Sequence, residues 1–150
     1  MFLEGILSIS GQAGLFKLIS KGNNNVIVES LNTGKRMPTF TSSRISTLSD
    51  VAIYTDDNED ISLREVLIKM FEKFNGETIK IGKDSNKELA QMLESVLPNY
   101  DKSRVYISDI KKLTNWYNSL IEHKILTKEN IKIESEEAKK SAEKENNATE

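Results

Sequence analysis

Apolar residues in the first third of the chain fall into short runs that are separated by Gly, Asn, Ser and Thr. The runs span residues 6–10, 15–20, 26–31, 35–40 and 51–55. Short runs of this kind, bounded by turn residues, are typical of strands. The most apolar stretch, residues 3–19, is punctuated by glycines and predicts the first β-hairpin. Five short strands joined by tight turns predict a small SH3-like β-barrel, with a curved meander or another small roll as alternatives.

Three details refine the expected arrangement of these strands. Pro38 has no N–H to donate to a ladder, so the fourth strand is expected at a sheet edge or at a bulge. The second strand is apolar on both faces, which indicates that the helix after the barrel covers one of them. Residues 41–50 are rich in Ser and Thr and predict a connector with one helical turn around Arg44 and Ile45.

From residue 62 onward the apolar period becomes helical. Residues 63, 66, 67, 70, 71 and 74 share one helical face, so we expect a helix over 62–75. Ser62 and Glu65 have the spacing of a capping box, and Asn75-Gly76 is typical of a left-handed C-cap. This segment is the strongest helix prediction in the chain.

Two further helices are expected. The second begins at a cap on Asp84 or Ser85 and ends at Pro98. The third is capped by Ser108 and runs to about His123. Both have apolar residues at helical spacing, so both are expected to pack against the remainder of the fold.

The remaining segments are expected to connect these helices or to extend beyond them. Residues 79–81 and 104–107 could pair as a minimal ribbon, and Ile125 and Leu126 are expected to fold back on the third helix. The last residues are polar and highly charged, so disorder is expected there. The predicted class is α+β, with a barrel at 1–57, a helical domain at 58–128 and a disordered polar tail at 129–150.

Composition excludes several functional classes. The 150 residues carry a formal net charge of −2, which gives no overall attraction to nucleic acid or to an anionic membrane. Cysteine is absent, which excludes disulfides and thiolate chemistry. Glu4 interrupts the apolar N-terminus and no basic residue precedes it, which argues against a secretory signal. No run reaches the roughly 18 apolar residues of a membrane span, so we expect a cytoplasmic protein without membrane association.

Three motifs have the spacing of a chemical site but lack its context. Gly11-x-x-Gly14 resembles a phosphate-binding loop, yet a strand follows it where such loops lead into a helix. Asp56-x-Asn58-x-Asp60 matches the start of a calcium loop, but the required Gly and the final Glu are missing. The single histidine, His123, lacks partners for a triad or a metal site. We predict no cofactor, no metal and no catalytic residue, and expect a non-enzymatic protein.

One segment combines basic and aromatic residues in the way that nucleic-acid binders do. The segment contains Arg104, Tyr106, Lys111, Lys112, Trp116 and Tyr117. Residues 61–130 nevertheless hold 12 basic and 10 acidic residues, which is a small surplus. Trp116 lies about a quarter turn from the main apolar stripe of its helix, so core packing, a protein contact and base stacking all remain open.

Two parts of the sequence resemble a family of unknown function from Bacteroidota. The first is the N-terminal pattern LEGILSISG, GLFKLIS and VIVESL, and the second is DKSRVY with SDIKK and NWY. Together they cover roughly residues 2–125. The resemblance implies a short cytoplasmic protein in which a characteristic N-terminal domain precedes a helical region. It brings no assigned activity, so it implies no functional residue.

We therefore expect a small protein-binding or adaptor module. SH3-like barrels present loops and an open edge to partners, which is an analogy of fold. The alternative is a nucleic-acid-associated protein that uses the surface from Arg104 to Tyr117, and a third possibility is an enzyme with a polar site that the sequence does not reveal. The oligomeric state stays open. The residues expected to contact a partner are Gly11, Gly14, Pro38, Arg104, Tyr106, Lys112 and Trp116.

Overall fold

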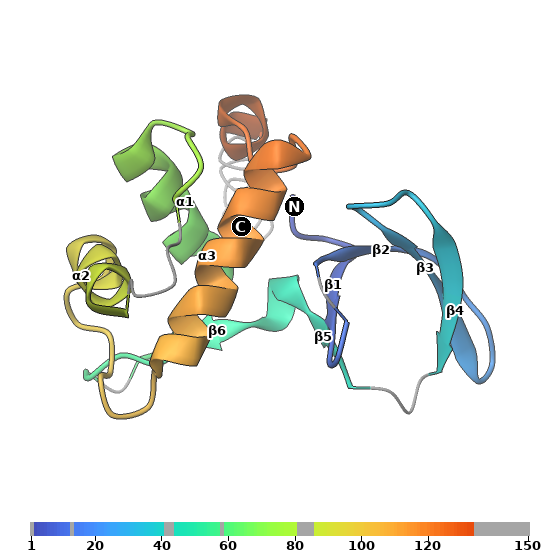
Figure 1. The fold of residues 1–150 in the computed structure, drawn as a ribbon, viewed down its shortest axis with the longest axis horizontal. Coiled ribbons are helices and arrows are strands. Elements are labelled where there is room, and N and C mark those ends of the chain that lie inside the picture. The colour runs from blue at the N-terminus through green and yellow to red at the C-terminus, as the bar shows by residue number, and fades with distance from the viewer. Residues whose placement is uncertain (1, 13, 41–43, 58, 81–85, 134–150) are drawn as a thin grey trace, which may run out of the picture.

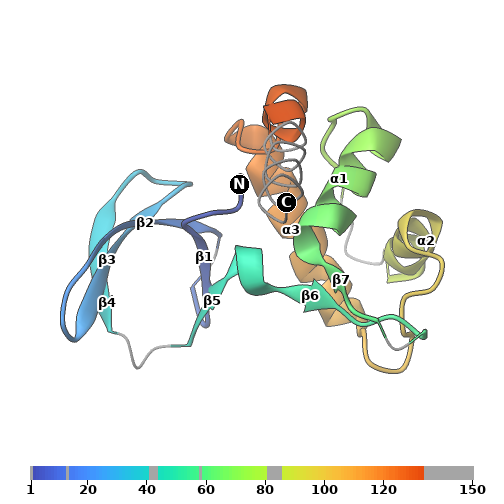
Figure 2. The same ribbon diagram turned by 180° about the vertical axis from the view of Figure 1, so that it is seen from behind.

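The computed structural model describes residues 2–12, 14–40, 44–57, 59–80 and 86–133. A sheet lies on one side of the molecule and the helices on the other, with α3 between the sheet and the α1–α2 pair (Figures 1 and 2). The elements are β1 (Ile6–Ile9), β2 (Phe16–Lys21), β3 (Asn25–Ser30), β4 (Arg36–Phe40), β5 (Ile45–Thr47), η1 (Leu48–Asp50), β6 (Ala52–Ile53), β7 (Ile61–Ser62), α1 (Leu63–Phe74), α2 (Asn86–Val96) and α3 (Ile107–Glu122).

The N-terminal sheet is antiparallel, has five strands and is open. Its order is β4-β3-β2-β1-β5, so β4 and β5 are its two edges, and no pairing joins them within the described residues. The class α+β is therefore confirmed, but the closed SH3-like barrel is not. Closure requires the edge strands to pair. Here β5 has three residues, and Pro38 on β4 offers no N–H.

The fifth strand of the sheet is not the predicted one. It is β5, from Ile45 to Thr47, inside the segment expected to be a connector with a helical turn. The predicted strand at 51–55 is shortened to β6, which pairs with β7 as a separate two-stranded ribbon. Leu48, fully buried in the short 3-10 helix η1, anchors the chain between the two sheets.

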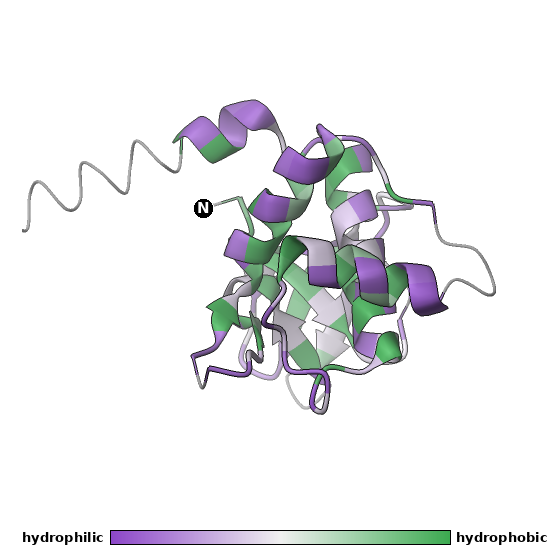
Figure 3. Ribbon diagram, turned by 90° about the vertical axis from the view of Figure 1, so that its left-hand side faces the viewer, coloured by the Kyte–Doolittle hydropathy of each residue, from purple (hydrophilic) through white to green (hydrophobic). Residues whose placement is uncertain are grey.

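Each face of the first sheet packs into a different cluster. Leu7, Phe16 and Val28 belong to a small cluster that is separate from the main core. The residues that precede Leu7 and Phe16, Ile6 and Leu15, belong to the main core together with residues of the helices. The alternating pattern of a strand explains this division. A helix does face one side of the sheet, but it is α3, which lies between the sheet and the α1–α2 pair (Figure 1), and not the expected helix directly after the strands. Hydrophobic and hydrophilic stretches alternate along the helices that face the viewer in Figure 3.

Helix α1 forms as its sequence predicts. The Ser62 Oγ accepts the Glu65 N–H at 3.4 Å, which satisfies one of the free donors at the helix start. Leu63, Val66, Leu67 and Met70 are buried along one face, and Asn75 ends the helix in the left-handed conformation with φ 54°. The predicted limits and face of this helix are confirmed.

Side chains of α3 replace the predicted ribbon between 79–81 and 104–107. Asn118 forms two hydrogen bonds of 2.7 Å with the N–H and C=O of Ile79. The Tyr117 hydroxyl donates to the Glu77 carbonyl at 2.8 Å. Burial, and secondarily the charge of Glu77, raises the pKa of Tyr117 to about 12. The backbone of Ile79 thus bonds to the Asn118 side chain where the prediction paired it with a strand. Residue 81 of the predicted ribbon lies outside the described residues.

The ends of α2 and α3 agree with the expected boundaries to within about a residue or two. The expected α2 caps at 84 and 85 lie outside the described residues. Helix α3 begins at Ile107 with Tyr106 in the N-cap position, so the predicted cap at Ser108 is wrong by two residues. The Asp109 carboxylate accepts the Tyr106 N–H at 3.0 Å. Leu126 folds back and is 1% exposed, as expected.

The chain continues past α3 into another helical segment. Thr127 Oγ1 accepts the N–H of Asn130 at 3.1 Å and caps it. Residues 128–133 are helical, although the sequence analysis assigned them mostly to the polar tail. The expectation of disorder further along concerns residues 134–150, which lie outside the described residues.

Candidate functional site

Two cavities open along helix α3. The first has a volume of about 200 Å³ and is mainly apolar. Its walls come from the β6 segment, the helices and the loop before α3, including Ile53, Leu63, Leu93, Val105, Ile110 and Leu113. The second has a volume of about 230 Å³ and lies between α3 and the β1–β2 hairpin. The second cavity thus lies where the first sheet meets α3, whereas the first cavity lies within the helical part.

Lys112 and Trp116 line both cavities. They are four residues apart on α3, so they project from the same side of the helix. Trp116 is half-buried and packs against the main core. We call the two cavities, with these shared residues between them, the α3 groove. Trp116 is therefore both a packing residue and part of the groove wall.

The hairpin side of the groove is formed by the turn between β1 and β2. Gly11 has φ 82° and Gly14 has φ 80°, a region that favours glycine. A Cβ on Gly14 would lie 2.5 Å from Nδ2 of Asn32. The Asn32 Oδ1 in turn lies 3.2 Å from Nε2 of His123, just beyond α3. These contacts join the hairpin to the helical part at one end of the groove, and the turn links two strands as predicted.

The second cavity is polar on several sides. Ser8, Ser10 and Gln12 line it from the hairpin, and Asn115 and Ser119 line it from α3. The Ser119 Oγ is buried and has no hydrogen-bond partner among the described residues. A buried hydroxyl without a partner is uncommon, because its desolvation is uncompensated. The cavity therefore offers hydroxyl and amide groups to a bound polar group.

Arg104 reaches the first cavity but is bound to the fold. Its Nε donates to the Asp101 carboxylate at 2.7 Å, and its Nη2 donates to the Thr55 carbonyl at 3.3 Å. Its guanidinium also lies 4.4 Å from the centre of the Tyr54 ring. The Ser103 hydroxyl, followed by Arg104, lowers the pKa of Asp101 to about 2. Two of the five N–H donors of Arg104 are thus engaged within the protein.

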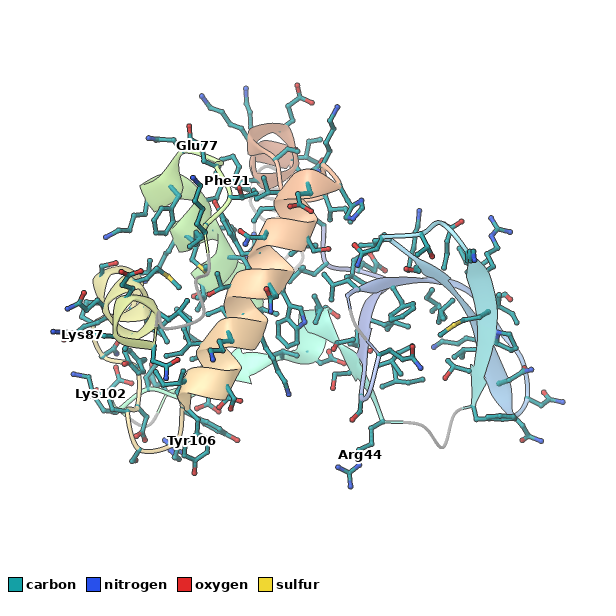
Figure 4. All side chains as sticks on the ribbon, in the orientation of Figure 1. Arg44, Phe71, Glu77, Lys87, Lys102 and Tyr106 are labelled. Carbon is teal, nitrogen blue, oxygen red and sulfur yellow. The ribbon has the colours of Figure 1, made fainter. Side chains whose placement is uncertain are left out.

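The structure divides the seven predicted contact residues into separate places. Pro38 lies on the outer strand β4 opposite Ile27, which confirms its edge position but removes it from the groove. Tyr106 is 64% exposed at the start of α3 and lines neither cavity (Figure 4). Four of the seven predicted contact residues line the second cavity, namely Gly11, Gly14, Lys112 and Trp116. Arg104 lines only the first cavity.

Sequence reasoning missed Asn115 and Ser119, two polar residues of α3 that line the second cavity beside the predicted Lys112 and Trp116. Lys112, Asn115, Trp116 and Ser119 follow the spacing i, i+3, i+4 and i+7. This spacing places them on one helical face, beside the buried face of Ile110, Leu113, Tyr117 and Leu120. The spacing of this second stripe could be seen in the sequence. The stripe becomes a cavity wall only because the β1–β2 hairpin packs beside it.

Within the ranges that the structure describes, no three His, Asp or Glu side chains gather in a way that could hold a metal ion. None of the helices in those ranges is both long enough and apolar enough to cross a membrane. A further cavity of about 540 Å³ is lined by Phe71, Glu72, Asn75, Lys128 and Ile131, at the end of α1. The α3 groove differs from it in having two cavities that share Lys112 and Trp116.

Comparison with known proteins identifies the family. Residues 3–48 match the domain of unknown function DUF5606, and residues 51–120 match the domain of unknown function DUF6852. The two matched segments meet at η1, whereas the sequence analysis placed the boundary at residue 57. No curated protein matches the chain.

A solved structure extends this similarity over most of the chain. It is a solution NMR structure of a Bacteroides vulgatus protein from a structural genomics consortium, with 44% sequence identity and a TM-score of 0.69. The match covers 83% of this chain and 89% of that one. The protein therefore belongs to a Bacteroidota family that is defined by domains of unknown function, as its sequence resemblance predicted.

Proposed function

We propose that the protein is a non-enzymatic binding module that takes a segment of a partner protein into the α3 groove. The observation that supports this most is the meeting of an apolar and a polar cavity at Trp116. A peptide segment combines an apolar side chain with a polar backbone, so it matches both cavities at once. Aromatic residues in such positions often dominate the energy of protein interfaces.

The size of the cavities supports a segment of protein over a compact small molecule. Small-molecule sites usually have volumes of about 300–1,000 Å³. The two cavities, at about 200 and 230 Å³, are each below that range. The first can accept a single aliphatic side chain, while the second can accept the adjoining polar groups. The groove therefore suits an extended ligand that fills each cavity in part.

The charged residues around the first cavity also support binding over catalysis. Arg104 is held by Asp101, and the Asp109 carboxylate is held by the Tyr106 N–H. Groups that are already bound to the fold are poorly placed to move protons or to clamp phosphates. The same engagement of Arg104 weakens the nucleic-acid alternative, because a phosphate would compete with a carboxylate already at 2.7 Å. The proposed setting is the cytoplasm, in keeping with the cysteine-free sequence.

Affinity capture tests this function. The tagged protein is exposed to a lysate of a Bacteroidota species, and bound proteins are compared with those captured by Asn115→Arg. Asn115 is exposed and lines the second cavity, so a long charged side chain there obstructs the groove without entering the core. Phe40→Ser is the matched control, because Phe40 is 68% exposed on the distant edge strand β4.

The proposal predicts a discrete protein that the wild-type chain and Phe40→Ser capture and that Asn115→Arg loses. Far-UV circular dichroism must first show that both variants are folded. Capture that Phe40→Ser abolishes and Asn115→Arg retains would instead place the interface at the sheet edge. Capture of nothing above background by the wild-type chain would contradict the proposed function.

A further inference from the structure

The α3 groove has a positive charge that the fold leaves without a partner. Lys112 is exposed at the position shared by both cavities. Within the described residues its ammonium group makes no hydrogen bond or ion pair, unlike the neighbouring Arg104. A carboxylate that entered the groove would therefore meet a free cation between an apolar and a polar cavity.

The polar cavity adds neutral groups that suit the same ligand. The buried Ser119 hydroxyl lacks a partner, and the amide of Asn115 lies one turn before it on α3. Hydroxyl and amide N–H groups both donate hydrogen bonds to carboxylate oxygens. Lys112 and Asn115 are both exposed and lie on one helical face, so a single anionic group can approach the two of them.

Resting on the proposed function, we infer that the groove recognises a carboxylate of the partner segment, together with an adjacent aliphatic side chain. The carboxylate binds beside Lys112 at the mouth of the polar cavity. The aliphatic side chain enters the apolar cavity next to Trp116. The carboxylate can belong to an Asp or Glu side chain or to the C-terminus of the partner, because both present the same two oxygens.

Selection from a random peptide library provides the test. The immobilised full-length protein selects displayed peptides, and the enriched peptides are then synthesised. Their binding is followed by the fluorescence of Trp116, which is the single tryptophan of the chain and lies in the groove. Each peptide is made with a free and with an amidated C-terminus, and with Asp or Glu replaced by Asn or Gln. These arms distinguish the two sources of the carboxylate.

The inference predicts enriched peptides that pair a carboxylate with an aliphatic residue. Neutralising that carboxylate, or introducing Lys112→Gln, weakens binding about fivefold, as expected for a partly solvated charge pair. Lys112→Arg keeps the positive charge and binds the peptides with the wild-type affinity. Lys112→Glu selects peptides that carry a basic residue in place of the carboxylate. Lys111→Gln is the matched control and leaves binding unchanged, because Lys111 lines neither cavity.

The possible failures are distinguishable. Peptides that bind the wild-type chain and are lost in Asn115→Arg, but lack a carboxylate or ignore Lys112→Glu, would overturn the inference and leave the proposed function standing. Peptides whose binding changes in neither Asn115→Arg nor Lys112→Glu would place recognition outside the groove and overturn both. The absence of any enriched peptide would also overturn both.

Discussion

Gly14→Ala tests the junction between the hairpin and the helical part. Alanine in the left-handed region costs about 1–2 kcal/mol relative to a right-handed conformation. Gly11→Ala is the matched reference, because Gly11 has nearly the same φ, but a Cβ there meets nothing within 4 Å. At Gly14 the new Cβ would lie 2.5 Å from Nδ2 of Asn32. Asn32 must then rotate away from His123 and lose its 3.2 Å contact.

The difference between the two variants follows from these contacts. Loss of an exposed neutral hydrogen bond costs about 0.5–1 kcal/mol, and repacking of Asn32 adds to it. We expect Gly14→Ala to lower the free energy of unfolding by about 2–3 kcal/mol and Gly11→Ala by about 1–2 kcal/mol. For a chain of this size, a loss of a further 1 kcal/mol in the free energy of unfolding lowers the melting temperature by roughly 2–4 °C.

Urea denaturation followed by far-UV circular dichroism measures these values, and Asn32→Ala provides the decisive background. With Asn32 shortened, the extra cost of Gly14→Ala should disappear, which gives a coupling energy of about 1 kcal/mol between the two sites. If Gly14→Ala costs no more than Gly11→Ala in the wild-type background, the close packing of the hairpin against Asn32 is wrong.

Three further predictions concern the helical part. Because the folded pKa of Tyr117 is raised to about 12, stability is retained below pH 10 and falls as the pH rises from 10 toward 12. The loss is on the order of 1 kcal/mol, allowing for partial solvation of the phenol, and denaturation of Tyr117→Phe should lack it. Ser62→Ala should lower the free energy of unfolding by about 1 kcal/mol in urea denaturation, because it removes the side-chain cap of α1. The Asp101 carboxyl should titrate at about 2 by NMR and move upward in Ser103→Ala and in Arg104→Gln; an unchanged value in both would contradict the hydrogen bonds described above.

The sequence was most informative where local signals and packing agree. Helix α1 has a cap, an apolar face and a left-handed end within one segment, so its limits could be predicted from 62–75 alone. The edge position of Pro38 followed in the same way from its missing N–H.

Features that depend on distant partners could not be predicted in this way. Strand β5 is only three residues long and is defined by its pairing with β1, so the Ser- and Thr-rich segment around it indicated a connector. The two bonds of Asn118 to Ile79 join positions 39 residues apart. Such pairings depend on the tertiary arrangement, which overrides weak local preferences.

The candidate groove combines both situations. Four of the seven predicted contact residues line the polar cavity, although they were singled out for unrelated reasons. Their meeting depends on how the hairpin packs against α3, which no local pattern specifies. Ser119 and Asn115 were missed because a polar residue on a helix usually faces solvent. Only the hairpin opposite them makes them part of a cavity.

The central claim is that the α3 groove binds a partner protein, and site-specific photo-crosslinking in living cells tests it most directly. Asn115→p-benzoylphenylalanine places the reactive group at the groove, and Phe40→p-benzoylphenylalanine places it on the far edge of the sheet. The proposal predicts one discrete covalent adduct with another protein from position 115 and none from position 40. An adduct from position 40 alone, or no adduct from position 115, would contradict it.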